Sequence, residues 1–149
     1  MIDDRAAMES ALAEASLAAS AGEVPIGAIV VREGMVIAGG HNRVIRDADP
    51  TAHAEIVAMR AAARVLGNYR LNGCMLYVTL EPCAMCAGAI IHARLDRLII
   101  AADDPKAGAA GSILSVINHP RLNHQMQVER GILAEESSEL LKSFFRERR

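Results

Sequence analysis

The chain alternates between short apolar runs and longer amphipathic segments. Runs of apolar residues predict strands at 26–31, 35–39, 75–80 and 97–101, and a shorter edge strand at 127–129. Apolar residues at helical spacing predict helices at 4–20, 51–66, 84–94 and 133–148. Strands and helices alternate from 35 to 101, and this order is typical of parallel strands joined by helical crossovers. The pattern therefore predicts an α/β fold.

The connecting segments complete this pattern. Arg32-Glu33-Gly34 separates the first two strands and predicts a hairpin. Polar loops are expected at 40–50 and 103–111, and a helical turn is expected at 112–117.

Two helices follow strands and are therefore expected to begin at the same edge of the sheet. Thr51 is the expected N-cap of the helix at 51–66. Pro82 suits the first turn of the helix at 84–94, because its φ is fixed and it has no N–H to leave unpaired. Binding sites in open α/β sheets lie at the carboxyl ends of strands, so these two helix ends mark the expected site.

Composition is that of one globular domain spanning residues 1–149. Hydrophobic residues make up 52% of the chain and charged residues 23%. The N-terminus lacks a signal-peptide pattern and no apolar run approaches the length of a membrane span, so we expect no membrane partner. Three cysteines, two of them in a metal-like motif, favour a reducing compartment, and we expect the cytoplasm.

Charge is unevenly distributed along the chain. The formal net charge of −2 argues weakly against a nucleic-acid partner. The last eight residues nevertheless hold four basic side chains against one acidic one: Lys142, Arg146, Arg148 and Arg149 against Glu147. A basic tail on an acidic body predicts a local phosphate contact, and the alternative is a solvated helix end.

The strongest chemical signal comes from two motifs at the predicted helix ends. Cys83 and Cys86 are three residues apart on one helix face, where the helix dipole favours thiolates. His53 adds an imidazole, and zinc accepts this ligand set. Three protein ligands leave one position for water, which is the catalytic pattern. Glu55 follows two residues after His53 and points to another side, so it is the expected general base.

Two alternatives to a catalytic zinc site remain open from the residues alone. A Cys-x-x-Cys pair also occurs as a redox motif, although a redox pair does not call for His-x-Glu on another helix. A closed structural zinc site needs a fourth ligand, and Cys74 is the spare cysteine. We expect Cys74 to be a small buried core residue instead.

The motifs His53-Ala54-Glu55 and Pro82-Cys83-Ala84-Met85-Cys86 resemble those of zinc-dependent nucleobase deaminases. Nearly the whole chain is similar to the bacterial tRNA-specific adenosine deaminases. The matching stretches are Glu23-Val24-Pro25-Ile26-Gly27-Ala28, Asn42-Arg43, Asp49-Pro50-Thr51-Ala52-His53-Ala54-Glu55-Ile56, Asn68-Tyr69-Arg70-Leu71, 76–88, Lys106-Ala107-Gly108-Ala109-Ala110-Gly111-Ser112 and Phe144-Phe145-Arg146. This resemblance implies a cytidine-deaminase-like α/β/α sandwich with a five-stranded mixed sheet, usually assembled as a homodimer.

The resemblance also implies a reaction and a role for each site residue. The reaction is hydrolytic deamination of adenosine to inosine at the wobble position of the anticodon loop of an arginine tRNA. The resemblance implies that His53, Cys83 and Cys86 hold one Zn²⁺ per chain and that Glu55 moves protons. It implies that Asn42 and the Ala54 backbone contact the flipped base. It also implies that Asp104 and Lys106 contact the anticodon loop, and that Phe145, Arg148 and Arg149 contact neighbouring nucleotides.

Two other functions compete with this reading. One is a deaminase of a free base or nucleoside, of the guanine or cytosine type, and the other is a non-catalytic, zinc-stabilised RNA-binding module. The basic tail and the loop at 104–112 favour RNA over a free base, because a free base needs no phosphate contacts. Glu55 favours an enzyme, since a structural zinc site has no use for it.

Overall fold

The computed structural model describes residues 1–148, so Arg149 and its predicted RNA contact lie outside the described residues. Nine elements follow one another in the order α1 (Asp4–Ser20), β1 (Gly27–Arg32), β2 (Met35–His41), α2 (Ala54–Leu66), β3 (Cys74–Leu80), α3 (Ala84–Ala93), β4 (Arg97–Ala102), β5 (Gln127–Arg130) and α4 (Ala134–Arg146). The predicted order of helices and strands is confirmed.

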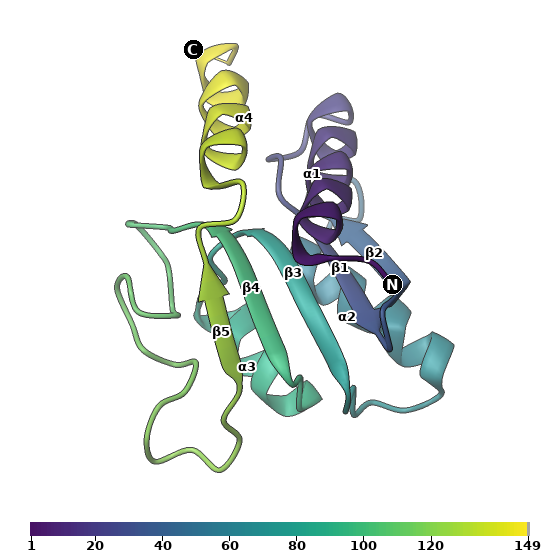
Figure 1. Cartoon of the computed structure of the whole chain (residues 1–149). Coiled ribbons are helices and arrows are strands. Elements are labelled where there is room, and N and C mark those ends of the chain that lie inside the picture. The colour runs from purple at the N-terminus through teal and green to yellow at the C-terminus, as the bar shows by residue number, and fades with distance from the viewer. Residues whose placement is uncertain (149) are drawn as a thin grey trace.

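The five strands form one mixed sheet in the order β2-β1-β3-β4-β5 (Figure 1). β1 pairs antiparallel with both β2 and β3, whereas β3, β4 and β5 run parallel. β2 and β3 therefore point the same way with β1 between them, and α2 is the crossover that joins them. α3 joins the adjacent parallel strands β3 and β4, as the sequence predicted.

Helices cover both faces of the sheet and give the predicted three-layer α/β/α sandwich. α2 and α3 lie behind the sheet, while α1 crosses its front and α4 rises beyond the end of β5 (Figure 1). The strands alternate between the two cores. Ala28, Val30, Leu76, Val78, Leu98 and Ile100 pack toward α2 and α3, whereas Ile29, Val31, Tyr77, Ile99 and Ala101 pack toward α1. This period of two is what a strand buried on both faces requires.

Close packing of α2 on β2 fixes where the first helix end lies. A Cβ added to Gly40 would come within 2.7 Å of Val57 Cγ1 and 2.8 Å of the Ala58 amide nitrogen. The glycine therefore lets the strand backbone approach α2 more closely than any other residue allows. The neighbouring His41 belongs to β2, not to the predicted loop, because it pairs with Gly27.

Two local predictions were wrong. The N-cap of α2 is His53 instead of Thr51, whose hydroxyl donates a 2.7 Å hydrogen bond to Asp49 Oδ1. Residues 112–117 form turns in place of a helical turn, because Ala110 and Ser115 make an isolated antiparallel bridge.

α4 rests on the carboxyl end of the sheet through few contacts. Ser137 Oγ donates to the Thr79 carbonyl oxygen, and Phe144 is 7% exposed. Phe145 is 48% exposed. Within residues 1–148, every helix falls short of the length and apolar character that crossing a membrane requires.

Candidate active site

His53 and Cys83 are the N-cap residues of α2 and α3, and neither side chain caps its own helix. N-cap residues usually use their side chains to accept hydrogen bonds from the first turn. Here both side chains turn toward each other. Cys86 lies in the first turn of α3, one turn after Cys83, and is fully buried. The two helix ends therefore bring one imidazole and two thiols together, as predicted.

The separations within this cluster fit a tetrahedral metal site. His53 Nδ1 lies 3.6 Å from Cys83 Sγ and 3.5 Å from Cys86 Sγ. All three ligand atoms lie within 4.8 Å of one another. Zinc bonds of ordinary length to sulfur and nitrogen at a tetrahedral angle place those atoms about 3.6 Å apart. The donor set and its spacing therefore fit Zn²⁺, with three protein ligands.

Within the cluster, the Cys83 thiol is the group whose pKa shift favours a cation. Hydrogen bonds from Cys86 and His53 hold the pKa of the Cys83 thiol well below its usual range. The hydrogen bond to Cys83 raises the pKa of the Cys86 thiol. The Cys83 sulfur is therefore a thiolate at neutral pH, at the positive end of the α3 dipole, where thiolates are favoured.

Glu55 is buried beside the cluster. It lies in the first turn of α2, two residues after His53, and is 4% exposed. Burial raises the pKa of Glu55 to about 7. A carboxyl group with a pKa near neutrality both accepts and releases protons efficiently at that pH. The geometry thus places Glu55 where the sequence expected a general base.

Asn42 and Ala54 lie at the two ends of the loop that joins β2 to α2. Asn42 follows β2, is 6% exposed, and its backbone N–H donates to the Ile26 carbonyl oxygen at 3.1 Å. Ala54 is the first residue of α2, and the first N–H groups of a helix have no partner within that helix. Ala54 adjoins His53, and Arg43, the neighbour of Asn42, donates its amide to the Ala52 carbonyl oxygen at 2.9 Å, so both residues lie near the start of α2.

A second cluster lies between the loop after β4 and helix α4. A groove of about 410 Å³ is lined by Val24, Leu80, Ala102, Asp103, Asp104, Pro105, Lys106, Ser138, Leu141, Lys142 and Phe145. A neighbouring hollow of about 610 Å³ shares Lys106 and Phe145 and adds Arg146 and Arg148. The structure therefore brings together Asp104, Lys106, Phe145 and Arg148, the described residues that were assigned to RNA contacts.

Two of these side chains make contacts within the chain. The Arg148 guanidinium stacks 3.5 Å from the centre of the Phe144 ring and donates to the Phe144 carbonyl oxygen. It therefore folds back on the helix and does not project beyond it. Asp104 Oδ1 accepts from the amides of Lys106 and Ala107, so it shapes its own turn.

Glu23 contributes to the site in a way that the sequence did not reveal. Its fully buried carboxylate accepts from the amides of Ile45 and Arg46, at 3.1 and 2.8 Å. These bonds hold the loop between Asn42 and His53 in place. A glutamate within the apolar stretch that precedes β1 was the available signal.

The remaining polar candidates have structural partners. Cys74 is buried in the core as expected, and His124 Nε2 bonds to the Leu95 carbonyl oxygen. His119 accepts from the Arg121 amide within a turn. None of the three therefore belongs to the cluster.

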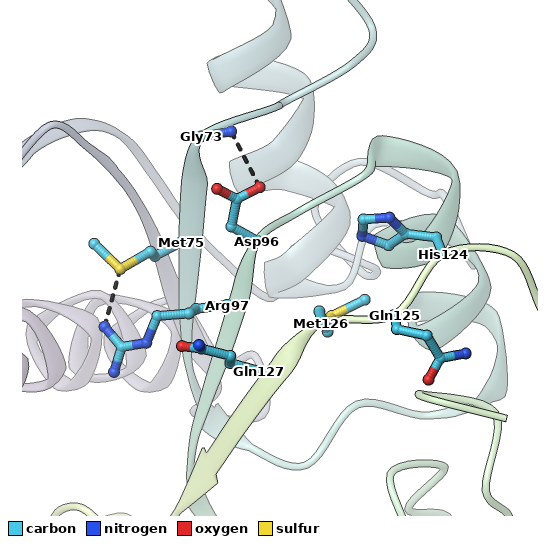
Figure 2. Close-up of a pocket in the computed structure, with 8 residues that line it drawn as sticks. All are labelled: Gly73, Met75, Asp96, Arg97, His124, Gln125, Met126 and Gln127. Atoms are coloured by element: carbon cyan, nitrogen blue, oxygen red, sulfur yellow. Dashed lines mark hydrogen bonds between the residues drawn. The ribbon is translucent and has the colours of Figure 1, made fainter. Parts of the chain in front are cut away.

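The hollow drawn in Figure 2 lies at the other end of the sheet. It has a volume of about 570 Å³ and is lined by Gly73, Met75, Asp96, Arg97, His124, Gln125, Met126 and Gln127, near the starts of β3, β4 and β5. Asp96 accepts from the Gly73 amide and Arg97 points to the Met75 sulfur (Figure 2). Arg97 also pairs with Asp4 and Glu129, so its charge is already balanced.

The three-layer sandwich and the His/Cys/Cys cluster at two helix ends define a deaminase of the cytidine-deaminase type. The sequence model of the MafB19-like deaminase family matches residues 2–149 of this chain. The tRNA-specific adenosine deaminase of Agrobacterium fabrum is 50% identical over 95% of this chain and 93% of its own length. This chain therefore belongs to the family of tRNA-specific adenosine deaminases.

Solved structures agree with this assignment. A tRNA:A34 deaminase, from work on A-to-I editing at the wobble position of transfer RNA, has a TM-score of 0.88 and 49% identity, covering 91% of this chain and 98% of its own. The guanine deaminase of Nitrosomonas europaea has a TM-score of 0.85 at 26% identity, covering 97% and 85%. The fold is thus common to both substrate classes, and the identity is higher with the tRNA deaminase.

Proposed function

We propose that this chain hydrolytically deaminates adenosine to inosine at the wobble position of a tRNA anticodon loop. The observation that carries the proposal is the buried Glu55 beside the cluster of His53, Cys83 and Cys86. The family supports it, because relatives with this reaction match nearly the whole chain. A structural metal site has no use for a buried carboxyl group at its edge, so the arrangement favours an enzyme over a binding module.

The proposed cofactor is one Zn²⁺ per chain, held by the three clustered residues. When bound, zinc lowers the pKa of a water molecule toward ~7 and so supplies a nucleophile at neutral pH. Glu55 would take one proton from the attacking water and deliver it to the ring nitrogen next to C6 of adenine as a bond forms between oxygen and C6. Glu55 would then take the proton of the new hydroxyl group and pass it to the exocyclic nitrogen, so that the bond from C6 to that nitrogen breaks and ammonia leaves.

Asn42 and Ala54 are proposed to hold the base. The amide side chain of Asn42 and the first N–H of α2, at Ala54, offer hydrogen-bond partners near the start of the helix that His53 caps. A stacked base cannot reach a buried cluster, so the adenosine must be unpaired and turned out of the loop.

The groove between Lys106 and Phe145 is the proposed contact with the rest of the anticodon loop. Lys106 supplies a positive charge for phosphate, and the exposed Phe145 ring offers a face on which a neighbouring base can stack. Asp104 contributes through the turn that it holds, and Arg148 and Arg149 add charge at the end of α4.

Three finer points are proposals that rest on the resemblance. The substrate is an arginine tRNA, the enzyme works in the cytoplasm, and two copies form a homodimer. Exposed apolar side chains support the homodimer. Met85, between the two cysteines, is 38% exposed, and Ile113 and Leu114 are exposed on the loop after β4. Sedimentation at several protein concentrations tests the dimer, and a panel of unmodified tRNAs tests the substrate.

The deciding experiment compares substrates side by side. Purified protein with its zinc content measured is incubated with an anticodon stem-loop RNA, free adenosine and free guanine. The proposal expects inosine in the RNA and little turnover of either small molecule. Faster turnover of guanine than of RNA would favour the alternative shared with the Nitrosomonas europaea enzyme. No turnover of any substrate by zinc-loaded protein would favour a binding module.

A further inference from the structure

Glu81 has a buried carboxylate for which the proposed chemistry provides no role. It lies at the end of β3, two residues before Cys83, and is 2% exposed. A buried carboxylate is costly unless hydrogen bonds and an opposite charge compensate it. Its partners therefore indicate what it does.

Those partners all come from the loop after β4 and from β5. Oε1 accepts from the Asp104 amide at 3.1 Å and from the Ser112 hydroxyl. Oε2 accepts from the amides of Ala110 and Ser112, at 2.9 and 3.1 Å. The Arg130 guanidinium pairs with Oε1 at 3.0 Å. Four hydrogen bonds thus tie this loop to a single carboxylate, and the ion pair ties β5 to it.

The loop backbone also passes directly against this carboxylate. A Cβ placed on Gly108 would overlap the Glu81 carboxyl group, so only glycine fits there. The Ala109 amide donates to the Pro82 carbonyl oxygen at 2.8 Å. The loop therefore packs on the two residues that lead into Cys83.

Hydrogen bonds through Asp104 link Glu81 to the groove that is lined by Lys106 and Phe145. It binds the Asp104 amide, and Asp104 Oδ1 in turn accepts from the Lys106 amide at 3.0 Å. Lys106 lines the groove together with Leu141 and Phe145 of α4. Two successive hydrogen bonds therefore set the place of Lys106 relative to the strand that precedes the metal cluster.

We propose that Glu81 is a positioning residue for RNA recognition: it holds the loop at 103–112 so that the groove and the metal cluster accept one anticodon loop together. This inference rests on the proposed function. It assigns Glu81 an effect on binding of the RNA and none on the chemical step, because the carboxylate touches neither the base nor the proposed zinc ligands.

Glu81→Gln tests the inference, since it keeps the shape but puts an amide NH₂ against N–H donors. We expect KM for the stem-loop RNA to rise at least about tenfold while kcat changes less than about threefold and zinc content stays equal. Hydrogen exchange at the amides of Asp104, Ala110 and Ser112 should accelerate, because their acceptor is weakened. Glu9→Gln, an exposed change on α1, is the matched control and should alter none of these values.

Two results would overturn the inference: an unchanged KM, or unchanged exchange at the three amides. If Glu81→Gln does not fold, Ser112→Ala decides, because it removes one donor and keeps the charge. It should raise KM by a smaller factor and speed exchange in the same loop, and no change in either contradicts the inference. If the unaltered chain does not deaminate RNA, the proposed function fails, whereas the exchange data still decide whether Glu81 holds the loop.

Discussion

His53 Nδ1 lies 3.6 Å from Cys83 Sγ although 30 residues separate them in the chain. They meet because α2 and α3 lie on the same face of the sheet and begin at the same edge, each with a side chain that can hold a metal at its N-cap. Neither motif alone provides a tetrahedral site. The fold completes the ligand set, so metal binding and folding are expected to depend on each other.

Zinc content is the first prediction. The chain should bind about one Zn²⁺, and His53→Ala or Cys86→Ala should lower both metal content and thermal stability, because a ligand is lost from a site that links two helices. Metal analysis with parallel melting curves measures this. Cys74→Ala is the control: it removes a buried cysteine outside the cluster and should keep the zinc. Full zinc occupancy in both ligand variants contradicts the assignment.

Loss of the proton carrier is the second prediction. Glu55→Gln should keep zinc and fold but lower kcat by at least about 100- to 10,000-fold, the usual contribution of general acid–base catalysis. The loss is expected at the upper end, because one residue serves several proton transfers. Single-turnover assays on the stem-loop RNA measure the chemical step directly. A variant that keeps most of its activity would remove Glu55 from the mechanism.

The groove provides the third prediction. Lys106→Ala should weaken RNA binding and make the dependence of log Kd on log salt shallower by about one unit, because one phosphate contact is lost. Its melting temperature should stay the same, since the side chain is exposed at the groove. Arg5→Ala, an exposed change on α1, is the charge control. Equal salt slopes for the two variants would place the RNA elsewhere.

The Asp4 network at the front of the sheet gives the fourth prediction. The Arg97 guanidinium and the Tyr77 hydroxyl, which donates at 2.6 Å, lower the pKa of Asp4 from 3.8. A carboxyl group whose pKa is lowered by folding stabilises the fold at pH values above its pKa in the unfolded chain. This stabilisation is lost as the pH falls through the pKa of the same group in the folded chain. Asp4→Asn should therefore reduce the free energy of unfolding by about 1 kcal/mol at pH 7. This is the contribution of a hydrogen-bonded ion pair, reduced because the pair is partly exposed to solvent.

Denaturant unfolding at pH 7 and at pH 3 measures this difference. The gap between Asp4→Asn and the unaltered chain should narrow at pH 3, because that pH lies below the unfolded pKa and the carboxylate of the unfolded chain is then largely protonated. Asp47→Asn breaks an exposed pair with Arg43 and should have a smaller effect at pH 7. A gap that does not change between the two pH values would mean that the Asp4 charge does not stabilise the fold.

Much of the fold could be predicted because its signals are local. The apolar runs of β1, β3 and β4 are long enough to identify strands buried on both faces, and the order of elements then limits the pairing. The metal cluster was predictable as well, because His-x-Glu and Cys-x-x-Cys place their side chains at helix ends.

The missing parts depend on contacts between distant segments. Glu23 and Glu81 each hold a loop through backbone amides more than 20 residues away, and a glutamate in an apolar stretch does not reveal which amides it binds. The Arg148 guanidinium stacks on the Phe144 ring, because a cation is attracted to the face of an aromatic ring. The charge of Arg148 alone does not predict this contact. Thr51 has the residue type of an N-cap, but its hydroxyl donates to the Asp49 carboxylate and does not cap the helix.

The most direct test of the central claim places one adenosine at different positions in the same RNA. Inosine formation is measured in an anticodon stem-loop with adenosine at the wobble position, and in a stem-loop of equal length with its only adenosine paired in the stem. We expect rapid conversion of the first RNA and little of the second, because the base must leave its stack to reach Glu55 and the metal cluster. Equal conversion of both RNAs, or conversion of free adenosine at the rate of the first, would contradict a wobble-position tRNA deaminase.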